Sequence, residues 1–166
     1  SLAKEHSACV VAAGVNPGFV MDLLVVALSG ATRRVTHVQV ERVLDPMSRR
    51  QAFRRKVGIG MKYQDATREV TRGAMGHVGL RQSALLIAKA LGWTPSAINE
   101  EIEVLCGDDV SGKRSRRPQA ADEPVSGLRQ TLRVRDGSRE VIRMEMVMQA
   151  GVEAPHDAIT IAGEPP

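Results

Sequence analysis

Apolar residues follow two different spacings along the chain, and together these predict an α+β protein. In some segments every second residue is apolar, which is typical of a strand with one buried face; in others apolar residues recur about every 3.6 positions, as on a helix. The predicted strands are Ala8–Ala13, Val35–Leu44, Ile98–Cys106, the two arms of a hairpin around Asp136-Gly137, and a short last strand with Ile159 and Ile161. The predicted helices are Pro17–Leu28, Gln64–Thr71 and Arg81–Leu91, with a polar, arginine-rich loop before Gly60. This order favours one mixed, largely antiparallel sheet with two or three helices packed on one face.

The junction between the first predicted strand and the first predicted helix is the most informative local feature. Asn16 is suited to cap the helix, Pro17 to be its first residue, and Gly18 leaves the backbone uncovered. A helix start has free N–H groups that can hold a polar or anionic ligand group. A well-capped helix start without a ligand explains the same residues, so both interpretations stay open.

Basic and glycine residues between positions 49 and 60 form a second candidate site. Arg49 and Lys56 carry positive charge next to Gly58 and Gly60. Guanidinium groups bind carboxylates in a planar fork, and glycines let a backbone approach a ligand closely. A solvated basic loop is the alternative. His77, which lies between Gly76 and Gly79, can reach a pocket near the next helix or serve only as a loop histidine.

The strand of the returning hairpin arm carries long side chains on both faces. Met144, Met146 and Met148 lie on one side, and Arg143 and Glu145 lie on the other. A sheet with helices on one face leaves its second face open. We therefore expect these methionines to be exposed in a monomer and the chain to form a homo-oligomer, a dimer or tetramer, through the sheet.

Composition and charge narrow the class of protein further. The net charge is +4 and the pI about 9.5, but the basic residues gather at 49–56 and 113–117 rather than along a helix, and aromatic residues make up only 2%. This predicts no nucleic-acid partner. No apolar run approaches the length of a membrane span, so we expect no membrane partner. The histidine and cysteine spacing predicts no metal site. Cys9 and Cys106 are expected to be buried thiols, which favours the reducing cytoplasm.

Several strings of residues, in one order along nearly the whole chain, resemble a known family. They are GVNPGFVMD at 14–22, VERV at 40–43, RKVGIG at 55–60, GHVGL at 76–80, LGW at 91–93, GLRQ at 127–130 and PHD at 155–157. They look like the C-terminal domain of the 2,4-diaminopentanoate dehydrogenases, NAD(P)-dependent enzymes akin to dihydrodipicolinate reductase. The likeness lapses at 112–123. The polar segment Gly107–Pro124 is expected to be a flexible loop within the domain.

The resemblance implies that residues 1–166 are the substrate-binding and oligomerisation domain of a longer NAD(P)-dependent oxidoreductase. Its substrate would be a small amine or amino acid. No G-x-G-x-x-G follows a strand, so NAD or NADP would be bound mainly by a Rossmann domain absent from this chain, and the isolated chain would be inactive. A non-catalytic ligand-binding or oligomerisation module is the alternative.

The resemblance also divides the candidate residues into two groups, and it assigns no catalytic residue. The residues expected to border the cofactor are Asn16, Pro17 and Gly18. Those expected to contact the substrate are Phe19, Arg49, Lys56, Gly58, Gly60 and His77.

Overall fold

A five-stranded mixed sheet forms the centre of the computed structural model, which describes residues 2–11, 13–107 and 120–164. The strands are β1 (Arg34–Leu44), β2 (Ala97–Cys106), β3 (Val125–Asp136), β4 (Arg139–Gln149) and β5 (His156–Glu164). Their order in the sheet is β2-β3-β4-β1-β5, with β1 and β4 parallel and the other neighbours antiparallel. The predicted mixed, largely antiparallel sheet is confirmed.

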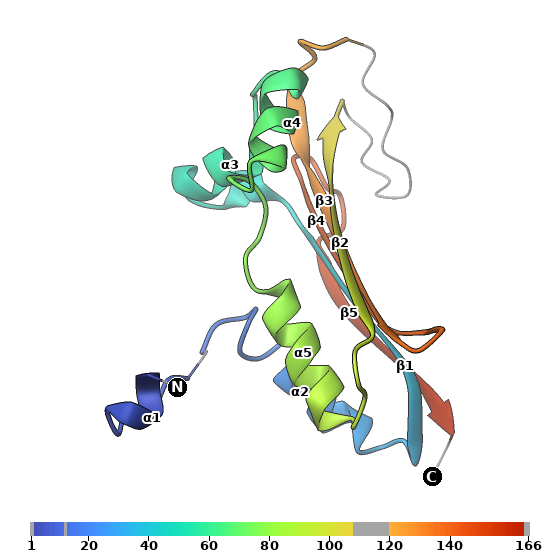
Figure 1. The fold of residues 1–166 in the computed structure, drawn as a ribbon. Helices are drawn as coiled ribbons and strands as arrows, with labels where there is room; N and C mark the ends of the chain where they lie inside the picture. The colour runs from blue at the N-terminus through green and yellow to red at the C-terminus, as the bar shows by residue number, and fades with distance from the viewer. Residues whose placement is uncertain (1, 12, 108–119, 165–166) are drawn as a thin grey trace.

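Helices cover one face of this sheet (Figure 1). They are α2 (Leu23–Ser29), α3 (Gln51–Val57), α4 (Tyr63–Thr71) and α5 (Leu80–Ala90), while α1 (Leu2–Glu5) lies apart from them. A short 3₁₀ helix, η1 (Pro46–Ser48), precedes α3. The α+β class is therefore confirmed, with more helices than the two or three expected. Part of the segment predicted to be an arginine-rich loop is helix α3, because Phe53 and Val57 pack against the core and stabilise it.

The core lies between the helices and the sheet. Its strand residues include Val38 and Val40 of β1 and Leu128 and Leu132 of β3, all buried. The methionines Met144, Met146 and Met148 belong to the same layer and are buried too. The expectation that these methionines are exposed on the open face was wrong. Because side chains alternate along a strand, the methionines point to one face of β4 and Arg143 and Glu145 to the other. The apolar faces of the helices cover the methionine side, and so bury that set.

The chain before α2 differs from the prediction. Residues 8–13 were predicted to form a strand, but those of them that the structure describes belong to none. Val10 and Val11 are 84% and 74% exposed. A strand needs a hydrogen-bonded neighbour, and none of the described strands pairs with this segment. Cys9 is exposed rather than buried, whereas Cys106 is buried as expected.

Helix α2 begins at Leu23, later than predicted, and its cap is Asp22 rather than Asn16. Asp22 accepts a hydrogen bond from the Leu23 N–H, while residues 16–18 form a turn in which the Asn16–Pro17 peptide is cis. The junction is thus a turn held by a buried carboxylate.

Most of the predicted loop Gly107–Pro124, residues 108–119, lies outside the described residues. After it, the Glu123 and Ala121 carbonyl oxygens accept hydrogen bonds from the N–H groups of Tyr63 and Gln64 at the start of α4. In the described part of the chain, no helix has the length and apolar character needed to cross a membrane.

Candidate functional site

The turn at Asn16 is fixed by a buried polar network between α2 and α5. Asp22 is fully buried, and its Oδ2 accepts hydrogen bonds from the Gly18 N–H (2.7 Å) and from the Ser83 hydroxyl (2.7 Å). Ser83 Oγ also lies 2.8 Å from Asn16 Oδ1. Gly79 permits this close approach, because a Cβ there would lie 2.5 Å from Pro17 Cδ. The network therefore sets the position of the Asn16 side chain.

His77 is held from two sides. Its N–H donates to Gln130 Oε1 (2.7 Å), and Gln130 Nε2 donates back to the His77 carbonyl oxygen (2.9 Å). The imidazole Nε2 lies 3.2 Å from the Asn16 carbonyl oxygen. Because that oxygen can only accept, Nε2 carries the hydrogen, and in the neutral ring the lone pair is on Nδ1.

The charge state of His77 follows from its surroundings. Burial lowers the pKa of His77 below its ordinary value, the hydrogen bond to Asn16 opposes this, and the positive charges of Lys56 and Arg42 lower it further. The ring is therefore neutral near pH 7, and its Nδ1 can accept a hydrogen bond or a proton.

Asn16 and His77 line one cleft of about 490 Å³. Its other walls come from the carboxyl-terminal halves of the parallel strands β1 and β4 and from the segment that contains η1 and the start of α3. The lining residues are Val15, Asn16, Arg42, Leu44, Ser48, Arg49, Arg50, Phe53, His77 and Met146. The cleft is thus apolar on part of its wall and carries several convergent polar groups, as ligand sites usually do.

The cleft brings together three of the residues predicted from the sequence, namely Asn16, Arg49 and His77. Pro17 and Gly18 adjoin it in the chain, but they contact Gly79 and Asp22. Phe19 is 56% exposed and does not line the cleft, and neither does Lys56, whose charge nevertheless acts on His77.

Gly58 and Gly60 have structural tasks outside the cleft. Gly58 ends α3 in the left-handed conformation, with its N–H bonded to the Arg55 carbonyl, and a Cβ there would collide with the Met75 methyl group. The Gly60 N–H donates to the Val125 carbonyl at 2.9 Å. Both N–H groups are already used, so this turn offers no cradle for a phosphate.

Arg42 is a cleft residue that the sequence reasoning did not single out. Its side chain is only 15% exposed, and Nη1 lies 3.3 Å from Asp157 Oδ2 of the neighbouring strand β5. The sequence did contain a sign of its role, because alternation along β1 places Arg42 on the same face as the buried residues Val38 and Val40. A charged residue on the buried face of a strand is rare without a specific partner.

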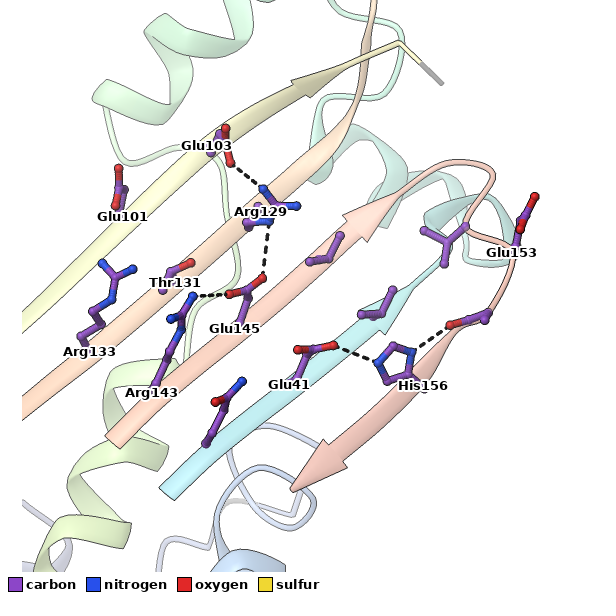
Figure 2. Close-up of a pocket in the computed structure, with 15 residues that line it drawn as sticks. Glu41, Glu101, Glu103, Arg129, Thr131, Arg133, Arg143, Glu145, Glu153 and His156 are labelled. Carbon is purple, nitrogen blue, oxygen red and sulfur yellow. Dashed lines mark hydrogen bonds and ion pairs between the residues drawn. The ribbon is translucent and has the colours of Figure 1, made fainter. Parts of the chain in front are cut away.

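A second, larger hollow of about 880 Å³ lies on the open face of the sheet (Figure 2). Several of its charged side chains are paired with one another: Arg129 contacts Glu103 at 3.0 Å and Glu145 at 3.5 Å, and Arg143 contacts Glu145 at 3.1 Å. Because Arg129, Arg143 and Glu145 at its centre are engaged with each other, this surface is a weaker candidate for a small-molecule site than the cleft.

His156 lies at the rim of this hollow. Its Nδ1 faces the Ala154 carbonyl and its Nε2 faces Glu41, both at 2.9 Å. These two acceptors raise the pKa of His156 above its ordinary value. In the described ranges of the chain, no three His, Cys, Asp or Glu side chains gather as a metal site requires.

Residues 19–166 match the family described as the 2,4-diaminopentanoate dehydrogenase C-terminal domain. The chain belongs to this family. A 111-residue stretch is 37% identical to the 2,4-diaminopentanoate dehydrogenase of Acetoanaerobium sticklandii, covering 64% of this chain and 31% of that protein. These findings confirm the family resemblance seen in the sequence.

The fold also has a counterpart of known structure. The amine dehydrogenase from Mycobacterium smegmatis superposes with a TM-score of 0.64 at 18% identity, over 87% of this chain and 43% of that chain. The likeness supports the α+β fold. The chain spans less than half the length of each of these two proteins.

Proposed function

We propose that this chain is the substrate-binding and oligomerisation domain of an NAD(P)-dependent oxidoreductase acting on a small amine or amino acid. The observation that carries the proposal is the convergence of Asn16, Arg49 and His77 on one cleft, although they come from three separate segments. The two similar proteins, a 2,4-diaminopentanoate dehydrogenase and an amine dehydrogenase, support the same class of reaction.

The cleft has the groups that such a reaction needs from the protein. Oxidation of an amine removes a hydride from the carbon and a proton from the nitrogen, and NAD or NADP supplies the hydride acceptor. One hydrogen of the Asn16 amide Nδ2 points to Met21 Sδ, at 3.0 Å, and its second hydrogen would orient the substrate. The neutral His77 offers a lone pair on Nδ1. Leu44, Phe53 and Met146 give an apolar wall that limits access of water.

The same proposal assigns the dinucleotide mainly to a domain not present in this chain. The chain has no G-x-G-x-x-G, and the N–H groups of Gly58 and Gly60 are already bonded to backbone carbonyls. Asn16, Pro17 and Gly18 would border the reactive end of the cofactor. The two free cysteines, Cys9 and Cys106, favour a reducing cytoplasm for the whole protein.

The proposal is tested in the polypeptide it requires, this chain together with its cofactor domain. Reduction of NAD and NADP is followed with 2,4-diaminopentanoate and with simple amines. Asn16→Ala should lower kcat/KM at least about tenfold, near 1.4 kcal/mol of transition-state stabilisation, with little change in unfolding. Gln64→Ala, at an exposed position of α4, is the matched control. Absence of cofactor reduction with every substrate, or full activity of Asn16→Ala, contradicts the proposal.

A further inference from the structure

We propose that a second small-molecule site, far from the cleft, binds an aromatic phosphate monoester, that is, a small ring compound with one terminal phosphate. The site is a hollow of about 470 Å³ at the end of the domain where α2 and α5 end and β1 begins (Figure 1). Arg34, in its lining, precedes Arg42 of the cleft by eight positions on β1, about 26 Å of extended strand. The hollow is therefore separate from the cleft.

The lining of this hollow carries unbalanced positive charge. Its charged residues are Arg33, Arg34 and Arg139, and none of the described lining residues is Asp or Glu. Glu164 Oε1 lies 3.7 Å from Arg34 Nη1 and offsets one charge. Within the described ranges, no carboxylate lies within ion-pair distance of Arg33 or Arg139. Two side-chain charges remain, and a phosphate monoester, at about −1.5 to −2 near pH 7, matches them better than a carboxylate or a phosphate diester does.

The ends of the two helices do not need these arginines. Arginines near a helix C-terminus often donate to its last carbonyl oxygens. Here the backbone does so: the Gly30 N–H donates to the Ala27 and Leu28 carbonyls of α2, and the Trp93 N–H donates to the Ala88 carbonyl of α5 at 2.9 Å. The guanidinium donors are thus available to a ligand, and guanidinium groups bind phosphate oxygens in a planar fork.

The same hollow has an apolar part that suits a ring. Val35, Leu91 and Trp93 line it, and each is half-buried and packed against the core. An aromatic ring placed on this surface removes apolar area from water and can stack on the indole of Trp93. A bare phosphate leaves that surface wet. The volume is in the usual range for small-molecule sites, so ring and phosphate can be held together.

The test is a titration of this chain followed by NMR. Trp93 is the one tryptophan of the sequence, so its indole N–H gives a single resonance that reports on the hollow. The probes are phenyl phosphate, inorganic phosphate, phenol and benzoate, at constant ionic strength and near pH 8, where the monoester is a dianion. Phenyl phosphate should shift the Trp93 indole and the Arg33 amide to saturation, with a Kd of about 1–5 mM. The other three probes should bind at least about fivefold more weakly.

Variants connect this binding to the arginines. Arg33→Gln and Arg139→Gln should each weaken the binding of phenyl phosphate about five- to tenfold, because each removes charge-assisted donors. Both positions are exposed, so the fold should persist, and the remaining resonances report on it. Arg81→Gln removes an exposed arginine at the other end of α5 and is the matched control, with an unchanged Kd. Arg139→Lys should recover only part of the loss, since lysine keeps the charge without the planar fork.

Four results would each overturn the proposal. One is no shift of the Trp93 indole with phenyl phosphate up to about 50 mM, well above a millimolar Kd. Another is equal affinity for phenol, benzoate or inorganic phosphate, a comparison within the wild-type chain. The third is an unchanged Kd in both Arg33→Gln and Arg139→Gln. The last is a response of Asn16 and His77 without one of Trp93, which would place the binding in the cleft.

Discussion

The side chain of Gln130 and the backbone of His77 exchange two hydrogen bonds, although the residues are 53 positions apart. Gln130 is 2% exposed, and its Nε2 also donates to Glu100 Oε1 at 2.6 Å. The loop that carries His77 into the cleft is therefore attached to strand β3 of the sheet. This attachment couples the stability of the fold to the geometry of the site.

Replacing this amide should destabilise the protein. Gln130→Leu leaves the backbone N–H and carbonyl of His77 without their partners in a partly buried setting, so we expect the free energy of unfolding to fall by about 1–3 kcal/mol. Urea unfolding measures the change. Gln39→Leu, on the open face of β1, is the control. A loss below about 0.5 kcal/mol, the range of ordinary surface changes, would contradict the role of Gln130.

The Ser83 hydroxyl should be needed to hold Asn16. Ser83→Ala removes one donor from the buried carboxylate of Asp22 and one contact of the Asn16 amide. We expect a loss of about 1–2 kcal/mol in unfolding free energy and a shifted side-chain amide resonance of Asn16. Ser96→Ala, at an exposed hydroxyl, should change neither. An unchanged Asn16 resonance in Ser83→Ala would show that the network does not position this residue.

His77 should make the protein less stable in mild acid. Its pKa is lowered in the folded state, so the unfolded chain binds the proton more readily. Its contribution to stability is fully present above the unfolded pKa, about 6.5, and is lost as the pH falls from there toward the folded-state pKa. Urea midpoints of wild type and His77→Gln between about pH 5 and pH 8 should show a smaller acid loss in the variant. The control His6→Gln, at an exposed histidine, should lose as much stability in acid as wild type does. If His77→Gln also loses as much stability in acid as wild type, His77 is not the group responsible.

Self-association through the open face of the sheet should depend on charge rather than on methionine. Glu101 is exposed and lines the hollow on that face. Light scattering at micromolar concentration should report at least a dimer, and Glu101→Lys should weaken it by placing like charges near the arginines of the facing copy. Asp65→Lys makes the same charge change on the helical side and should leave association unaltered. A strictly monomeric wild type would end this idea.

The isolated chain should not retain a dinucleotide. Calorimetric titration with NADH or NADPH should show no Kd below about 1 mM, a binding free energy near 4 kcal/mol. The reason is that the N–H groups of the turn at Gly58 and Gly60 are already bonded to backbone carbonyls and cannot hold a pyrophosphate. Micromolar affinity would show that the chain holds its own cofactor site.

The local pattern of the sequence was sufficient for the strands of the sheet and for helices α4 and α5. Alternation along β1 placed Val38 and Val40 on one face, and the Asp136-Gly137 turn located the β3–β4 hairpin, because these features depend on neighbours close in the chain. The family followed from strings of residues spread over the whole chain, and the match over residues 19–166 confirms it.

Other features were decided only by tertiary structure. Alternation showed that Met146 and Glu145 point to opposite faces of β4, but it could not show which face the helices cover. The cap of α2 depended on Ser83, which lies 61 residues from Asp22 in the chain and helps to hold its buried carboxylate. The apolar run before Asn16 met the local pattern of a strand, yet its described residues form none, because a strand needs a neighbour to pair with.

The candidate site shows the same division. Asn16, Arg49 and His77 could each be named from residue type and flanking glycines or prolines, since the chemistry of a side chain is a local property. Their meeting in one cleft, and the presence of Arg42 among them, depend on β1 running parallel to β4 and on the contact between Gln130 and His77. The sequence by itself determined which groups were available. The packing of helices on the sheet decided which of them face the same space, because that packing joins residues too far apart in the chain for any local pattern to relate.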